Sequence, residues 1–105
     1  MVIIRGTTPT ININITSELD LTDVTQVWAY ITQYNGLKVD KLISDVDVQP
    51  DNDRIVLTLT QTDTLKLDAG KALFQIRLLL DDGTALADVA EEFDVLEVYK
   101  GGIIA

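Results

Sequence analysis

The sequence contains no cysteine and no histidine. Without thiols the chain forms no disulfide framework. Without imidazole or thiolate groups it lacks the usual ligands of a zinc site, the commonest general base and a strong nucleophile. These two absences exclude most mechanisms of hydrolases, transferases and redox enzymes. We therefore expect a protein that is not an enzyme and that uses no cofactor and no metal.

Basic residues are also scarce, with eight Lys and Arg against 17 Asp and Glu and a net charge of −9. A protein that neutralises phosphates concentrates its cations on one face, whereas these cations are scattered along the chain. The two Asp-rich stretches, 45–53 and 81–97, would repel phosphate groups. We expect no binding to nucleic acid and none to an anionic membrane.

Long apolar segments are missing as well. The longest runs have four or five residues, whereas a transmembrane helix needs about 20. The opening MVIIRG has no charged region ahead of a long apolar stretch, as an export signal would have. The expected place of synthesis is the cytoplasm, with no export by that route.

The residues that are abundant favour strands. Ile, Val and Thr number 11, 10 and 12, nearly a third of the 105 residues, and β-branched side chains pack well on a pleated sheet. Seven or eight short alternating segments are separated by turns every eight to twelve residues, with no long helix. This pattern predicts an all-β protein with the architecture of a β-sandwich. We expect one domain over residues 1–105, with a short flexible tail from about residue 99.

The alternation of apolar and polar residues also predicts the core. A shift of one residue in register would turn every side chain of a strand to the other face, so each position is a distinct prediction. We expect these residues to point inward: Ile11, Ile13, Val27, Ala29, Ile31, Ile55, Leu57, Leu59, Phe74, Ile76, Leu78, Phe93 and Val95.

A polar turn interrupts the alternation between residues 54–60 and 71–80. Thr60 can cap the N–H of residue 63 while Asp63 reaches back, which is a capping box with aspartate in place of glutamate. Leu65 and Leu67 would then close one end of the sandwich. We expect the two flanking strands to lie in opposite sheets. A direct hairpin is the less favoured alternative, because the connection is ten residues long.

Two short signals mark other turns. Asn35-Gly36 tolerates the positive φ angles of a type I′ turn and predicts a hairpin between strands 25–34 and 37–44. Asp20 and Asp23 have the spacing of a capping box and predict a single helical turn. The mixed alternation of 37–44 indicates an edge strand or a bulge.

The acidic residues Asp45, Asp47, Asp51 and Asp53 permit a calcium interpretation, because hard cations take clustered carboxylate oxygens. The stretch lacks the glycine and distal glutamate of an EF-hand. A solvated acidic edge, which discourages pairing between sheet edges, is the favoured interpretation.

The other polar motifs give equally little indication of a catalytic or ligand-binding site. Asp81-Asp82 is favoured as an exposed turn over a pair of catalytic carboxylates. Ser17 and Ser44 are the only serines and lack an activating base nearby in sequence. Gly101-Gly102 has no phosphate-loop context and is interpreted as a flexible hinge.

The strand TQVWAYITQY, residues 25–34, carries the candidate interface. The favoured interpretation turns Val27, Ala29 and Ile31 inward and leaves Trp28, Tyr30 and Tyr34 on an outer face. The alternative buries Trp28 as the central tryptophan of an immunoglobulin-like sandwich and turns Ala29 outward. Aromatic residues are enriched at the centres of protein interfaces, so an outward row of them would bind a subunit or another protein.

The crossover also carries a family resemblance. LTLTQTDTLKL (57–67), followed by an alternating strand, an Asp-Gly turn and a last strand, resembles the N-terminal domain of phage baseplate upper proteins. The opening apolar run with Arg5-Gly6-Thr7-Thr8-Pro9 is similar to that of small prophage tail proteins. The similarity covers residues 1–15, the hairpin at Asn35-Gly36 and residues 55–95.

This resemblance implies an immunoglobulin-like sandwich that acts by assembly as a virion structural protein, with no catalytic residues. The expected function is a non-catalytic component of a phage or prophage tail or baseplate. Its partners would be other tail or baseplate proteins and further copies of itself, and its final location the virion tail. A carbohydrate- or protein-binding adhesion module is the alternative, and it would require exposed rings with polar groups beside them.

Overall fold

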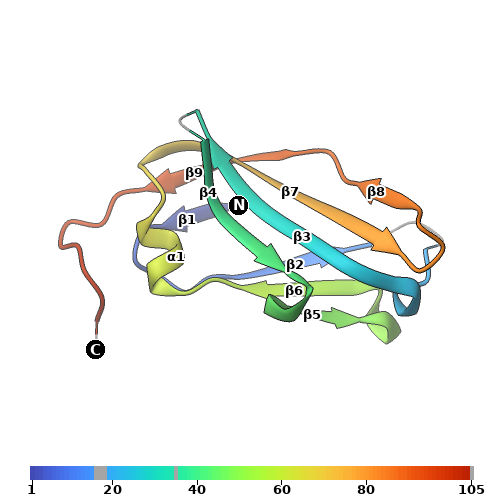
Figure 1. The fold of residues 1–105 in the computed structure, drawn as a ribbon. Helices are drawn as coiled ribbons and strands as arrows, with labels where there is room; N and C mark the ends of the chain where they lie inside the picture. Colours follow the sequence, from blue (N-terminus) through green and yellow to red (C-terminus); the bar gives the residue numbers. More distant parts are fainter. Residues whose placement is uncertain (16–18, 35, 105) are drawn as a thin grey trace.

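Two β-sheets pack face to face in the computed structural model, which describes residues 1–15, 19–34 and 36–104 (Figure 1). The larger sheet contains, in spatial order, β1 (Val2–Ile4), β9 (Glu91–Leu96), β7 (Gly70–Leu80), β3 (Val24–Gln33) and β4 (Gly36–Leu42), with β8 (Ala85–Ala87) also paired to β7. The smaller sheet contains β2 (Thr10–Asn14), β6 (Arg54–Thr58) and β5 (Val46–Gln49). The predicted all-β sandwich is confirmed.

The strand order is that of an immunoglobulin-like sandwich, with B, E and D strands in one sheet and G, F, C and C′ strands in the other. The described residues form nine strands rather than seven or eight, because the expected last strand is broken between β8 and β9. These two strands pair antiparallel with successive halves of β7, and β1 pairs parallel to β9.

The core lies between the sheets. All thirteen residues that the alternation turned inward are buried, which confirms the predicted inward side of every strand concerned. Five further apolar residues join this core: Ile3, Leu21, Val39, Leu67 and Ala72.

The polar turn is a crossover between the two sheets, as predicted. It contains α1 (Gln61–Leu65), which follows β6 in the smaller sheet and precedes β7 in the larger one (Figure 1). The Thr60 hydroxyl accepts a hydrogen bond from the Asp63 N–H at 3.1 Å, and the Asp63 carboxylate accepts one from the Thr60 N–H at 2.9 Å. The capping box is therefore confirmed. Leu67 is fully buried, whereas Leu65 is only half-buried.

Polar side chains from distant segments hold this crossover in place. Arg5 donates from Nε to the Leu67 carbonyl at 2.7 Å and from Nη2 to the Leu65 carbonyl at 3.1 Å. The buried Gln33 amide accepts from the Asp68 N–H and donates to the Asp68 carbonyl, both at 2.8 Å. These contacts satisfy backbone groups at the C-terminal end of the short helix and in the residues just after it. The crossover is consequently tied to both the beginning of the chain and the end of β3.

The smaller turn predictions are confirmed in part. β3 and β4 form an antiparallel hairpin, with a register shift after Ile31, and β4 lies at the edge of its sheet. Asn35 lies outside the described residues, so its turn type stays a prediction. Asp20 caps the 3-10 turn η1 (Leu21–Asp23) and accepts from the Thr22 N–H at 3.0 Å. Two more 3-10 turns flank β5: η2 (Ile43–Asp45) and η3 (Pro50–Asn52).

Candidate interaction face

The solvent-facing side of the larger sheet, here called the outer face, contains Trp28 near its middle. Trp28 pairs with Leu42 on β4 and with Arg77 on β7. Its neighbours Val27 and Ala29 are fully buried, and 47% of Trp28 is exposed. The interpretation that turns Val27, Ala29 and Ile31 inward is confirmed. The alternative, in which Trp28 is buried and Ala29 points outward, was wrong because the aliphatic row is the one that fits between the sheets.

The outer face is rich in large apolar side chains. Strand register places on it eight such residues, each between 40% and 57% exposed: Val2, Ile4, Trp28, Leu37, Leu42, Leu73, Leu79 and Leu96. Solvated sheets usually alternate apolar residues on the inside with polar residues on the outside. An exposed apolar surface that extends over several strands is characteristic of a binding surface.

Arg77 covers part of the Trp28 ring. Its guanidinium carbon lies 5.1 Å from the ring centroid, in the geometry of a cation–π contact. Beside this pair is a shallow hollow of about 150 Å³, whose lining includes Gln26, Leu79 and Ala85. One face of the tryptophan ring is thus already occupied by the protein's own side chain, and the space next to it is mainly apolar.

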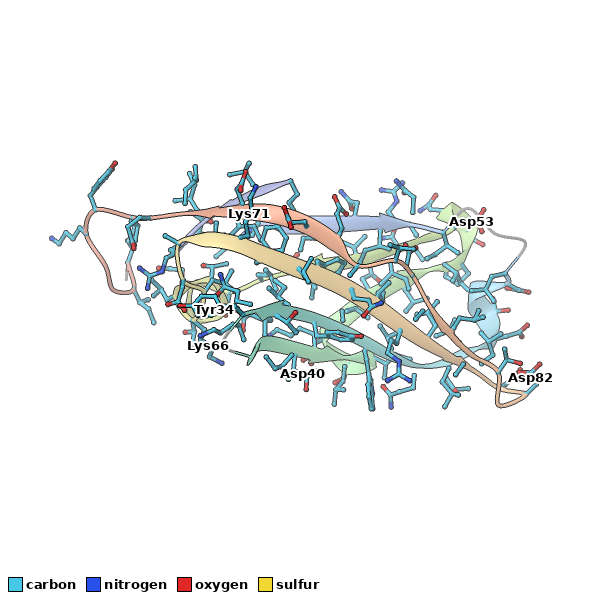
Figure 2. The ribbon with its side chains drawn as sticks, turned by 90° about the horizontal axis from the view of Figure 1, so that it is seen from above. Tyr34, Asp40, Asp53, Lys66, Lys71 and Asp82 are labelled. Carbon is cyan, nitrogen blue, oxygen red and sulfur yellow. The ribbon has the colours of Figure 1, made fainter. Side chains whose placement is uncertain are left out.

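The two tyrosines of the predicted interface lie differently. Tyr30 is the next outward residue after Trp28 on β3, is half-buried, and donates from its hydroxyl to Gln75 Oε1 at 2.7 Å. Tyr34 follows the end of β3 and is 94% exposed. Figure 2 shows it at the turn between β3 and β4. The fold therefore brings Trp28 and Tyr30 together and leaves Tyr34 apart from them.

Sequence reasoning missed the leucines of the outer face. Leu73 and Leu79 occupy outward positions of β7, where alternation alone leads one to expect polar residues such as Gln75 and Arg77. The signal was present in the run Leu78-Leu79-Leu80, since consecutive large apolar residues in a strand place apolar side chains on both faces.

Charged residues at the side of the outer face pair with one another. Lys71 lies 2.6 Å from a carboxylate oxygen of Asp94 and 3.8 Å from one of Glu92. The hydrogen bond to Asp94 and the charge of that carboxylate raise the pKa of Lys71 above its usual value. This cluster belongs to β7 and β9, so it lies away from the pairing of β3 with β4.

The acidic stretch 45–53 makes local contacts. Asp45 accepts from the Leu42 N–H at 3.0 Å, and Asp47 accepts from the Gln49 amide at 2.7 Å. Among the described residues, no group of three or more acidic side chains is placed to hold a metal ion. The fold therefore does not bring the acidic residues of this stretch together as a set of calcium ligands.

The remaining candidate residues lie at exposed positions or outside the description. Asp82 accepts from the Thr84 N–H at 2.9 Å at the turn between β7 and β8, and hydrogen bonds from Thr84 lower the pKa of Asp82. Ser44 is exposed, and Ser17 lies outside the described residues. Gly101-Gly102 lies in the exposed tail. Within the described ranges, no helix has the length and apolar character required to cross a membrane.

The comparisons with known proteins support the fold. The chain is similar to the solved structure of CopC from Methylosinus trichosporium OB3b, with a TM-score of 0.54 and 19% sequence identity. The similarity covers 94% of this chain and 86% of that one. No family model matches the chain, and no curated protein matches it. At this identity the similarity establishes the β-sandwich and does not transfer an activity.

The expected function as a phage or prophage tail component requires correction. One solved protein with a similar fold is CopC, a copper-binding protein, and this similarity points away from a structural component of a tail or baseplate. The expectation that this chain is a virion, baseplate or tail protein was wrong for the same reason. The likeness of residues 55–95 to baseplate upper proteins stays a sequence-based prediction.

The residues of this chain do not fit a copper site. Imidazole and soft sulfur groups are the characteristic ligands of copper in proteins, and the chain has no histidine, no cysteine and a single methionine, Met1. The described carboxylates form no cluster that could replace these ligands. Copper binding is therefore not carried over from CopC to this protein.

Proposed function

We propose that this chain is a non-catalytic protein-binding domain that self-associates through its outer face. The observation that carries the proposal is the exposed apolar surface around Trp28, which extends over β4, β3 and β7 through Leu42 and Leu79. Burial of apolar surface is the main favourable contribution to most protein association. A central tryptophan surrounded by leucines has the composition of an interface core.

The charge distribution supports the same function. The chain carries a net charge of −9, which opposes association over most of its surface. At the centre of the outer face the ionic side chains are few, and Arg77 there is positive. Two copies that meet through the centre of this face therefore bring few like charges together.

Sedimentation velocity over a wide concentration range tests the proposal. We expect wild type to form a dimer that dissociates on dilution, and Trp28→Ser/Leu79→Ser to remain a folded monomer at the highest concentration. The matched control is Val89→Ser, because Val89 is also apolar and is 86% exposed but lies off the strands of the outer face. The control should associate as wild type does.

The sole tryptophan gives an independent measurement. If the outer face is the interface, Trp28 emission should shift to shorter wavelength as the protein concentration rises, because the half-exposed ring loses its water. A wild type that stays monomeric, or a double variant that associates like wild type, would refute the proposal. Circular dichroism confirms that each variant keeps its fold.

A further inference from the structure

Two exposed charges of opposite sign flank β3 on the outer face. Arg77 is on β7 opposite Trp28, and Asp40 is on β4 opposite Tyr30. The order β7-β3-β4 places them on opposite sides of β3. Figure 2 shows Asp40 along the β4 side of the sheet. The strand β3 therefore has a positive charge on its β7 side and a negative charge on its β4 side.

Neither charge has an ionic partner among the described residues. The Arg77 guanidinium lies over the Trp28 ring, and the described part of the chain offers Asp40 no salt bridge or side-chain hydrogen bond. Lys71, the other exposed cation of β7, is by contrast paired with Asp94. The centre of the outer face therefore keeps one cation and one anion available to another molecule.

We infer that the outer faces of two copies pack around a two-fold axis that runs along β3, so that Arg77 of each copy binds Asp40 of the other. This inference rests on the proposed self-association. Rotation by 180° about an axis along β3 exchanges the two sides of that strand, which places β7 of one copy over β4 of the other. The axis is parallel to β3 and lies midway between the two sheets, so Trp28 meets its own symmetry equivalent at the centre of the interface.

The dimensions of a sheet-on-sheet contact agree with this pairing. Residues 28 and 30 are two positions apart along a strand, about 6.6 Å, and stacked sheets lie about 10 Å apart. The Cα atoms of Arg77 and the opposite Asp40 are then separated by about 12 Å. An extended arginine and an aspartate together span this distance.

The size of the face also fits a second copy. With strands about 4.8 Å apart and a rise of about 3.3 Å per residue, the three strands that face the other copy around this axis, β7, β3 and β4, cover roughly 440 Å² in projection. Side chains roughen this plane, so the accessible surface is larger. Stable interfaces bury about 800 Å² on each partner, with weaker ones below this value. The contact between these three strands therefore has the size of a weak, reversible dimer interface.

Charge reversal tests the arrangement by sedimentation velocity. Arg77→Glu alone places a glutamate opposite each Asp40, and Asp40→Lys alone places a lysine opposite each Arg77. We expect either variant to raise the dimer dissociation constant at least tenfold. An equimolar mixture of the two should form a heterodimer close to wild type in affinity, because both contacts are then attractive. A mixture of Arg77→Glu with the double variant Arg77→Glu/Glu92→Lys, which carries its new lysine on β9, is the matched control and should not recover.

The outcomes separate this inference from the proposed function. Recovery in the first mixture and none in the control supports the axis along β3. If wild type dimerises but neither reversal weakens it, or if the mixture fails to recover, the arrangement is overturned and self-association stands. If wild type is monomeric, both are overturned. Arg77→Glu also removes the contact of Arg77 with the Trp28 ring. That loss persists in the mixture, so it cannot account for recovery of the dimer.

Discussion

Asp63 makes two contacts that stabilise the crossover, and Asp63→Asn should weaken one of them. Its carboxylate accepts the Thr60 N–H within the capping box and lies 2.9 Å from the Lys41 ammonium on β4. Asp63 is only 6% exposed. Asparagine has the same shape and keeps an oxygen for Thr60, but it removes the charge that Lys41 pairs with.

The expected loss follows from the nature of the contact. A hydrogen bond to a charged group contributes about 1.5–3 kcal/mol, and less when one partner reaches solvent, as Lys41 does in part. We therefore expect Asp63→Asn to cost about 1–2 kcal/mol at neutral pH. For a chain of this length each kcal/mol corresponds to roughly 4–8 °C in melting temperature. Asp63→Ala should cost more, because the capping bond is lost as well.

The pH dependence has a definite sign. Burial raises the pKa of Asp63, but hydrogen bonds from the Thr60 N–H and the Lys41 ammonium outweigh burial and hold this pKa below its usual value. A lowered folded-state pKa contributes stability above the unfolded-state pKa, about 3.9 for aspartate, and this contribution is lost as the pH falls through the folded-state value. The difference between wild type and Asp63→Asn should therefore be constant near neutral pH and shrink below about pH 4.

Urea unfolding of both proteins across this pH range gives the measurement. The difference in unfolding free energy isolates Asp63 from the other carboxylates, which titrate in both proteins. Asp51→Asn, at an exposed position of η3, is the control and should change stability by less than about 0.5 kcal/mol. A difference that stays the same down to the acid limit of folding would show that the Asp63 charge is not what stabilises the crossover.

Two further predictions concern single positions. Leu67→Ala should cost about 2–5 kcal/mol in urea unfolding, because Leu67 is fully buried, and half-buried Leu65→Ala should cost clearly less; equal costs would contradict the assigned burial. Asp53 has a left-handed backbone with φ of 49°, so Asp53→Gly should be more stable than Asp53→Ala by about 1 kcal/mol, and the reverse order of melting temperatures would disprove left-handed strain there.

The sequence alone was sufficient for the sandwich and its inner surface. Strict alternation in segments such as Ile11-Asn12-Ile13 and Phe74-Gln75-Ile76 determines which side of a strand is apolar, and burial of that side follows from the hydrophobic effect. Thr60 and Asp63 likewise predicted the crossover, because a capping box depends on residues only three positions apart. Local periodicity and local hydrogen bonding were enough for these features.

Contacts between distant residues were decided by the tertiary structure alone. No sequence spacing indicates that Arg5 donates to the carbonyl of Leu67 or that Lys41 pairs with Asp63. The pairing of β7 with β3 likewise placed Arg77 over Trp28 and joined the two strands at the centre of the outer face. The physical reason is that alternation specifies the side of a strand to which a residue points, whereas strand order and register specify its neighbours across the sheet.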